Sequence, residues 1–191
     1  MTDHERIAAG LRALAAVATE TADRLTGLDD VVAAMRRVLA QDGTLFFAGN
    51  GGSAADAQHI AAEYVVRYHA NQPRALRAVA LTTDSSILTA TGNDFGFEQL
   101  FARQLEALAR PGDLLIVHST SGNSDNCIAA VKRARLLGVV TIGFVGQGGG
   151  KLRALVDHAV VVPDDRVNHI QEIHLALQHQ IASILTAEFG S

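Results

Sequence analysis

Three side chains of this chain follow one another at intervals of four residues and could do acid–base or metal chemistry: His59, Glu63 and Arg67. On an α-helix this spacing puts them on nearly one face. A histidine and a carboxylate at this spacing can hold a metal together, or one can tune the protonation of the other. Such pairs are also common on solvated helix surfaces, so the spacing alone leaves both interpretations open.

A second group of polar side chains lies near the C-terminus. There a helix expected from about residue 168 to residue 188 carries Gln171 and His179 among several other polar residues. These two are eight residues apart, which is a rise of ~12 Å along a helix. They could meet a single ion only by leaning toward each other, or through subunits that pair across a shared site.

A glycine-rich segment, Gly49–Ser53, directly follows the apolar run Leu45–Ala48 and precedes an expected helix. Glycines let a backbone approach a ligand closely, and a helix N-terminus offers unpaired N–H groups and the positive end of the helix dipole. The segment therefore predicts a phosphate-binding loop, with a tight turn as the structural alternative.

A dinucleotide site is a weaker interpretation of the same loop. Gly49, Gly51 and Ala54 fit the loose glycine spacing of such sites. The acidic residue that should end the next strand has only Asp84 as a candidate, and Asp84 comes after two threonines. We rank this interpretation below the phosphate site.

A second loop, Ser119–Ser124, follows the apolar run Leu114–Val117 and His118. It holds four hydroxyl side chains and one glycine, whereas capping a helix needs only one Ser or Thr. Hydroxyls and backbone N–H groups can hold a phosphate without Lys or Arg. This loop therefore predicts a neutral anion site.

A third glycine run, Gly146–Lys151, does not match a nucleotide-binding P-loop. Its spacing is wrong, and Leu152 stands where Ser or Thr would bind magnesium. We interpret this run as a flexible turn.

A carboxylate and an imidazole beside a phosphorylated sugar would suit aldose–ketose isomerisation. That reaction moves a proton between adjacent carbons through an enediol, so it needs a base at carbon and a second group for the oxygen protons. Glu63 and His179 are the candidates for these two roles. A metal could polarise the carbonyl or fix the geometry.

Five short apolar runs, separated by helical stretches, must position these loops. They lie at residues 45–48, 78–81, 114–117, 139–145 and 159–162. Short buried strands that alternate with helices predict an α/β fold, with a doubly wound five-stranded parallel sheet flanked by helices. Ligands in such sheets bind beyond the carboxyl ends of the strands, where both predicted phosphate loops begin.

The N-terminal segment, residues 1–41, is expected to be a helical extension of a single domain that spans residues 1–191. Its apolar spacing predicts two helices broken near Gly27, with Asp29 or Asp30 at the start of the second. The apolar stripe of the first helix needs a partner, either a neighbouring subunit or the chain's own core.

Composition narrows the class of protein. Apolar residues make up 48% of the chain, aromatic residues only 5%, and the formal net charge is −4. That balance argues against nucleic acid as a partner. The single cysteine, Cys127, rules out an internal disulfide, and we see neither a signal peptide nor an apolar run of membrane-spanning length. We therefore expect a cytoplasmic protein with no membrane contact.

Four motifs resemble those of the sugar isomerase (SIS) family, and within it those of the phosphoheptose isomerases. They are GNGGSAADAQHIAAE at residues 49–63, TGNDFGFEQLF at 91–101, STSGNS at 119–124, and IQEIH at 170–174 with the following His179. The resemblance runs from about Leu45 to the C-terminus. It implies conversion of sedoheptulose 7-phosphate to D-glycero-D-manno-heptose 7-phosphate.

The resemblance also implies roles for individual residues. It makes Glu63 and His179 the acid–base pair and implies a homotetramer with active sites between subunits. It implies one zinc ion per subunit on His59, Glu63, Gln171 and His179. Contacts with the sugar phosphate are implied for Asn50, Gly51, Gly52, Ser53, Glu63, Arg67, Asn93, Asp94, Ser119, Thr120, Ser121, Ser124 and Gln171.

Two points of the resemblance stay open. A carboxylate bound to zinc is a weaker base, so the metal could be structural, electrophilic or displaced during turnover. The family usually has Arg or Lys before Ile170, whereas this chain has Asn168 and His169.

Two rival functions come from other classes. One is a non-catalytic SIS adaptor that binds a replication-initiator protein, and the other is a sugar-phosphate sensor. The adaptor lacks the glutamate and the final histidine of the motifs, and a sensor needs no acid–base pair. The presence of Glu63 and His179 in this chain favours the enzyme.

Overall fold

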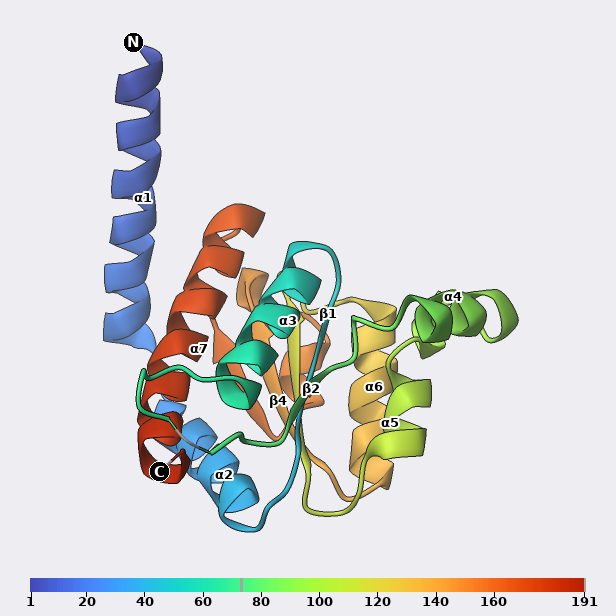
Figure 1. The fold of residues 1–191 in the computed structure, drawn as a ribbon. Coiled ribbons are helices and arrows are strands. Elements are labelled where there is room, and N and C mark those ends of the chain that lie inside the picture. Colours follow the sequence, from blue (N-terminus) through green and yellow to red (C-terminus); the bar gives the residue numbers. More distant parts are fainter. Residues whose placement is uncertain (73, 191) are drawn as a thin grey trace.

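The computed structural model describes residues 1–72 and 74–190 as alternating helices and strands (Figure 1). In chain order the elements are α1 (Asp3–Arg24), α2 (Leu28–Ala40), β1 (Leu45–Gly49), α3 (Gly52–Val65), β2 (Ala78–Ala80), α4 (Ser85–Asp94), α5 (Ala102–Leu108), β3 (Leu114–Ser119), α6 (Asp125–Leu136), β4 (Val140–Val145), β5 (His158–Val161) and α7 (Val167–Phe189). Short 3-10 turns lie at Phe97–Gln99, Gln147–Gly149 and Leu152–Ala154. None of the helices in the described ranges is both long and apolar enough to cross a membrane.

The five strands form one parallel sheet in the order β2-β1-β3-β4-β5. Every residue of β1 and β3 is buried, which explains why these strands read as continuous apolar runs. The doubly wound α/β prediction is therefore confirmed. The strand bounds differ from the predicted ones by a residue or two.

Helices cover both faces of the sheet (Figure 1). Alternate strand residues such as Phe47 and Ile116 pack against α2, α3 and α7. The intervening residues, such as Phe46 and Val117, pack against α5 and α6. Each fully buried large side chain stabilises the fold by about 1.5–3 kcal/mol relative to exposure.

The N-terminal region forms two helices that break at Gly27, as the sequence predicts. The second helix starts at Leu28 with Gly27 as its N-cap at φ +79°, so the predicted start at Asp29 or Asp30 is wrong. Both aspartates lie instead in the first turn, where the helix dipole favours negative charge.

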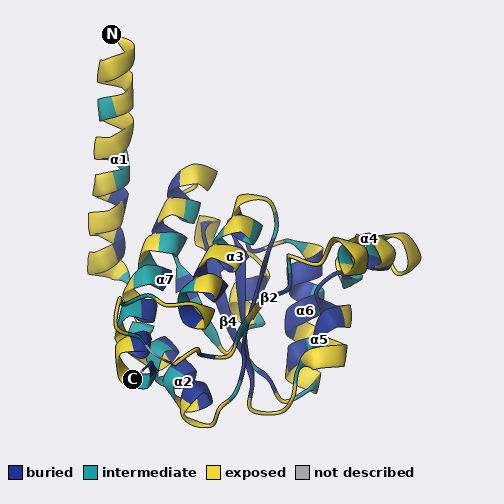
Figure 2. Cartoon of the chain, viewed as in Figure 1, coloured by how far each residue is buried: buried dark blue, intermediate teal, exposed yellow. Residues whose placement is uncertain are grey.

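Helix α1 stands away from the rest of the molecule (Figures 1 and 2). Its start is fixed by a capping box between Thr2 and Glu5. Only Val17 and Thr21 are buried along its 22 residues, whereas Ile7 and Leu11 are largely exposed.

Two histidines interrupt the apolar layer between the sheet and α7. His118 on β3 and His174 on α7 are fully buried, with ring centroids 6.0 Å apart. Burial lowers the pKa of His118 to about 3, and the neighbouring His174 adds to this shift. Burial also lowers the pKa of His174 to about 4. Both rings are therefore neutral at neutral pH.

We expect the free energy of unfolding to decrease as the pH falls from about 6.5 toward 4. In that window the unfolded chain binds protons at His118 and His174 while the folded chain does not, which costs up to about 1.4 kcal/mol per pH unit for each histidine. Urea denaturation across this range measures the slope. His174→Leu should make the free energy of unfolding depend less on pH, whereas the same change at exposed His4 should leave the pH dependence unchanged. An unaltered slope in His174→Leu would contradict the assignment.

Candidate active site

The two predicted phosphate loops lie side by side. The first loop follows β1 and the second follows β3, and these two strands are neighbours at the centre of the sheet. The strand order reverses between them, because β2 lies on one side of β1 and β4 on the other side of β3. Parallel sheets of this kind bind ligands at such a switch point.

Crowding and backbone conformation both require glycine in the first loop. Gly51 has φ +57° and forms the N-cap of α3. A Cβ at Gly49 would lie 2.7 Å from the Ser53 carbonyl oxygen, and a Cβ at Gly52 would lie 2.5 Å from Gln171 Oε1. The loop therefore has no room for side chains at Gly49 and Gly52 and needs glycine at Gly51 for its positive φ.

A reciprocal amide pair joins the first loop to helix α6. Asn50 Nδ2 donates to Asn126 Oδ1 at 2.8 Å, and Asn126 Nδ2 donates to Asn50 Oδ1 at 2.7 Å. Sequence reasoning missed Asn126, which is buried in the first turn of α6. The only signal for Asn126 in the sequence is its place two residues after the second loop, Ser119–Ser124, which we call the serine loop.

The second loop has its hydroxyls close together and its turn fixed by a glycine. Ser119 Oγ and Ser124 Oγ are 3.1 Å apart and share a hydrogen bond. Gly122 has φ +65°, and a Cβ there would lie 1.9 Å from the carbonyl oxygen of Gly149. No side chain larger than hydrogen fits at Gly122 without displacing backbone.

The third glycine run contains a 3-10 turn at Gln147–Gly149, in agreement with the predicted turn, and also hydrogen-bonds to the second loop. Gly146 N donates to the Thr120 carbonyl at 3.1 Å, and Leu152 N donates to the Gly122 carbonyl at 3.0 Å. Lys151 N donates to Asn123 Oδ1 at 3.1 Å. Two backbone donors of the run, together with the adjacent Leu152 N, thus hold the second loop in place.

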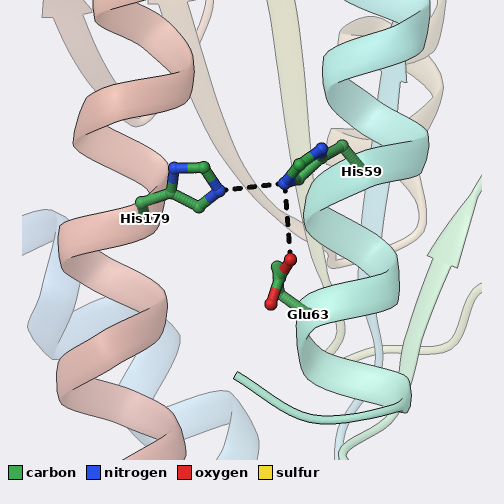
Figure 3. A group of neighbouring side chains, drawn as sticks. All are labelled: His59, Glu63 and His179. Atoms are coloured by element: carbon green, nitrogen blue, oxygen red, sulfur yellow. Dashed lines mark hydrogen bonds and ion pairs between the residues drawn. The ribbon is translucent and has the colours of Figure 1, made fainter. Parts of the chain in front are cut away.

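Helices α3 and α7 bring three of the predicted residues together (Figure 3). His59 Nε2 lies 2.9 Å from His179 Nε2 and 3.3 Å from Glu63 Oε1. One ligand atom from each residue lies within 4.8 Å of the others, which is a geometry that could hold a metal ion. Two imidazoles and one carboxylate match the ligand types of catalytic zinc sites that keep an open position.

Within the single chain, Arg67 lies beyond the end of α3 and Gln171 lies at the first loop. Helix α3 ends at Val65, so Arg67 is exposed beyond the helix and does not continue the face of His59 and Glu63. The Gln171 carboxamide lies against Gly52 at the first loop. Its role as a fourth metal ligand stays a prediction.

Asn93 and Asp94 end helix α4, which projects from the side of the molecule (Figure 1). Asn93 Nδ2 donates to Asp94 Oδ1 at 2.7 Å, and both residues are exposed. Nearby, a hollow of 520 Å³ is lined by the first loop, by Gly92 and by Phe97. A comparable hollow of 540 Å³ at the end of β5 contains none of the predicted site residues.

Asp56 is a titratable residue that sequence reasoning missed. It lies on α3 between the first loop and His59, and its Oδ2 is buried without a hydrogen-bond partner in the described part of the chain. Burial raises the pKa of Asp56 to about 6, against an opposing effect of His59. A carboxyl group with such a pKa can carry a proton near neutral pH.

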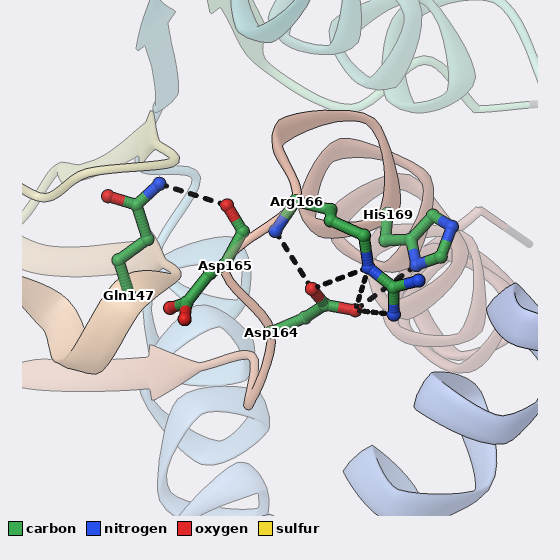
Figure 4. A network of polar contacts seen from close by, with 5 residues as sticks. All are labelled: Gln147, Asp164, Asp165, Arg166 and His169. Atoms are coloured by element: carbon green, nitrogen blue, oxygen red, sulfur yellow. Dashed lines mark hydrogen bonds and ion pairs between the residues drawn. The ribbon is translucent and has the colours of Figure 1, made fainter.

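The start of α7 is anchored by one carboxylate (Figure 4). Asp164 accepts hydrogen bonds from the backbone and guanidinium of Arg166 and from His169 Nδ1 at 3.1 Å. The guanidinium holds the pKa of Asp164 well below its usual range. His169, which departs from the family pattern, is therefore part of this anchor.

The comparisons with known proteins agree with this architecture. The sequence pattern of the SIS domain family matches residues 8–146. The chain belongs to the SIS domain family. It is 45% identical to the phosphoheptose isomerase of Akkermansia muciniphila over 182 residues, which cover 95% of this chain and 92% of that protein. It is 50% identical to the phosphoheptose isomerase of Nitratidesulfovibrio vulgaris over 165 residues, 86% of this chain and 77% of that protein.

The fold is also that of a solved phosphoheptose isomerase. The structure of the Neisseria gonorrhoeae protein superimposes with a TM-score of 0.90 at 41% identity, covering 97% of this chain and 100% of that chain. The family resemblance deduced from the four motifs is therefore confirmed. The SIS-domain chain is an isomerase of the phosphoheptose isomerase group and acts on sugar phosphates.

We expect Gly122→Ala to abolish phosphate binding, because the added methyl group displaces the carbonyl of Gly149 and with it the serine loop. Calorimetric titration with inorganic phosphate measures the loss. Gly148→Ala is the matched control, because Gly148 also has positive φ but an added Cβ meets nothing within 4 Å. It should cost about 1–2 kcal/mol of stability and keep phosphate binding. Retained phosphate binding in Gly122→Ala would place the anion elsewhere.

Proposed function

We propose that the chain converts sedoheptulose 7-phosphate to D-glycero-D-manno-heptose 7-phosphate, with Glu63 and His179 as the acid–base pair. The observation that carries this proposal is the convergence of a glutamate and two histidines from α3 and α7 within 4.8 Å. The high identity to phosphoheptose isomerases supports the choice of substrate. A sensor or an adaptor would need no such cluster.

In this proposal the two loops hold the phosphate. Backbone N–H groups at the starts of α3 and α6 and the hydroxyls of Ser119, Thr120, Ser121 and Ser124 bind its oxygens. Asn50, Gly51, Gly52 and Ser53 complete the site from the first loop. Gly52 and His59 are seven residues apart on α3, a rise of ~10 Å, so the sugar chain extends from the loops toward the cluster.

The chemistry then requires one carbon-bound proton and one oxygen-bound proton to move. Glu63 removes a proton from C1 of the ketose, which gives an enediol, and returns it to C2. His179 transfers the hydroxyl proton from O1 to O2, so the C2 carbonyl becomes a hydroxyl and C1 becomes the aldehyde. No atom is gained or lost.

We also propose that the sugar phosphate is contacted by Arg67, Asn93, Asp94 and Gln171.

We further propose that His59, Glu63 and His179 hold one zinc ion, with Gln171 as an additional ligand. The nitrogen and oxygen donors of this set suit zinc. A bound zinc ion would supply Lewis-acid polarisation of the sugar oxygens. Without an ion, His59 Nε2 lies within hydrogen-bonding distance of His179 Nε2, so His59 can orient this imidazole directly.

The remaining parts of the proposal concern the assembly. We propose that residues 1–191 form a single domain, that residues 1–41 contribute to a homotetramer, and that the active sites lie between subunits. The exposed apolar side chains of α1 support a partner for this helix. A cytoplasmic location is supported by the unpaired, buried thiol of Cys127.

We expect Glu63→Gln to lower kcat by at least about 10²-fold, because the amide cannot accept the carbon-bound proton. Binding of the sugar phosphate should remain measurable by calorimetry, since the phosphate loops are unchanged. Glu172→Gln on the exposed side of α7 is the control and should keep full activity. Full activity in Glu63→Gln would remove this residue from the chemistry.

We expect the purified protein to carry close to one zinc ion per subunit. Elemental analysis measures the content, and His59→Ala should reduce it strongly, since this residue has the central position in the cluster. His158→Ala, on β5, is the control. A protein without zinc whose activity is intact and insensitive to chelators would reject the ligand assignment.

A further inference from the structure

The side of α7 that faces the sheet carries one amide among apolar residues. Gln178 is fully buried, and its Nε2 lies 3.1 Å from Nε2 of His118, which is fully buried near the end of β3. Ile181 and Leu185 continue the same buried side of α7. Apart from the neighbouring His174 ring, the layer around this polar contact is packed mainly by hydrocarbon.

The amide nitrogen of Gln178 sets the direction of the hydrogen bond, because it can only donate. Because burial lowers the pKa of His118 to about 3, its ring is neutral and its Nε2 can accept a proton donated by the Gln178 amide. Gln178 Oε1 has no hydrogen-bond partner in the described residues, and the His118 ring has only a weak contact with the Ala48 carbonyl besides its bond to Gln178. Buried polar atoms of this kind cost about 1–3 kcal/mol each, so an apolar pair would give a more stable fold.

Such a hydrogen bond can define the position of a helix on a sheet more narrowly than apolar packing does. Hydrophobic contact has no preferred direction, whereas a hydrogen bond requires a particular distance and angle. Strand β3 is paired along its length with β1 and β4, which makes it the most constrained strand of the sheet. The hydrogen bond from Gln178 to His118 therefore restricts how far α7 can rotate about its axis or slide along it relative to β3.

The two residues also stand next to functional positions. Gln178 immediately precedes His179, and His118 immediately precedes Ser119, which begins the serine loop. His179 Nε2 must stay about where it is, 2.9 Å from His59, for the cluster to exist. A slide of α7 by about 1 Å would be enough to lower the rate strongly.

We propose that Gln178 and His118 are positioning residues that hold α7 in the register in which His179 meets His59 and Glu63. This inference rests on the proposed function, since it concerns the same acid–base pair. Neither residue contacts the reacting atoms.

The first test compares two changes of the same kind on α7. Gln178→Met removes the amide at similar size, and Gln180→Met makes the same change at the neighbouring exposed glutamine. Gln178→Met should lower kcat about 10- to 100-fold with KM changed less than about twofold, because the phosphate loops stay intact. Gln180→Met should behave as the unaltered protein. An unchanged kcat in Gln178→Met would overturn the proposal.

A second set of variants separates positioning from stability. The double variant His118→Leu with Gln178→Met replaces both polar partners, so its melting temperature should recover relative to either single variant. Its kcat should stay low, because the directional contact is still missing. His118→Gln, which keeps a buried acceptor, should retain more activity than His118→Leu. Recovery of kcat together with the melting temperature in the double variant would show a purely structural role.

A third measurement does not depend on turnover. Titration with Zn²⁺ alone should give a dissociation constant about tenfold weaker for Gln178→Met than for Gln180→Met, because a displaced His179 is a poorer ligand. If the unaltered protein fails to isomerise the sugar phosphate, the proposed function falls while this titration still tests the positioning. Equal zinc affinity in the two variants would overturn the positioning role.

Discussion

The reversal of strand order between β1 and β3 is the constraint on which the rest of the site depends. Because the chain leaves these neighbouring strands in opposite directions, no connection covers the crevice above their carboxyl ends. Two helices begin at that crevice, and the Asn50–Asn126 amide pair ties their starts together. The crevice that we propose as the phosphate site is thus a consequence of topology, and the loop sequences refine it.

In the proposed function the site binds an anion although the chain has a net negative charge. Neither the first nor the second loop contains Lys or Arg, so the attraction comes from backbone N–H groups, hydroxyls and helix dipoles. Groups held in place by the fold do not have to be ordered when the ligand arrives, which lowers the entropy cost of binding. The glycine run Gly146–Lys151 contributes to this order by supporting the serine loop.

The sequence was sufficient for the fold and for the loops because both follow from local patterns. Buried parallel strands read as apolar runs, and Gly49–Ser53 carries its own backbone signal. The meeting of Glu63 with His179 was a hypothesis, since nothing in the spacing relates α3 to α7. Three features arise from tertiary packing, which leaves no periodic pattern in the sequence. They are the end of α3 before Arg67, the packing of Gly122 against Gly149 and the buried His118–Gln178 contact.

Helix α1 has a consequence for how the molecule behaves on dilution. A helix of 22 residues with two buried side chains gains little from packing on its own chain, and most helices in proteins owe their stability to such packing. Its capping box fixes where the helix starts but contributes only about one kcal/mol. In the proposed assembly a second copy covers Ile7 and Leu11, so the helical content of the first two dozen residues would be the part of the secondary structure most sensitive to protein concentration.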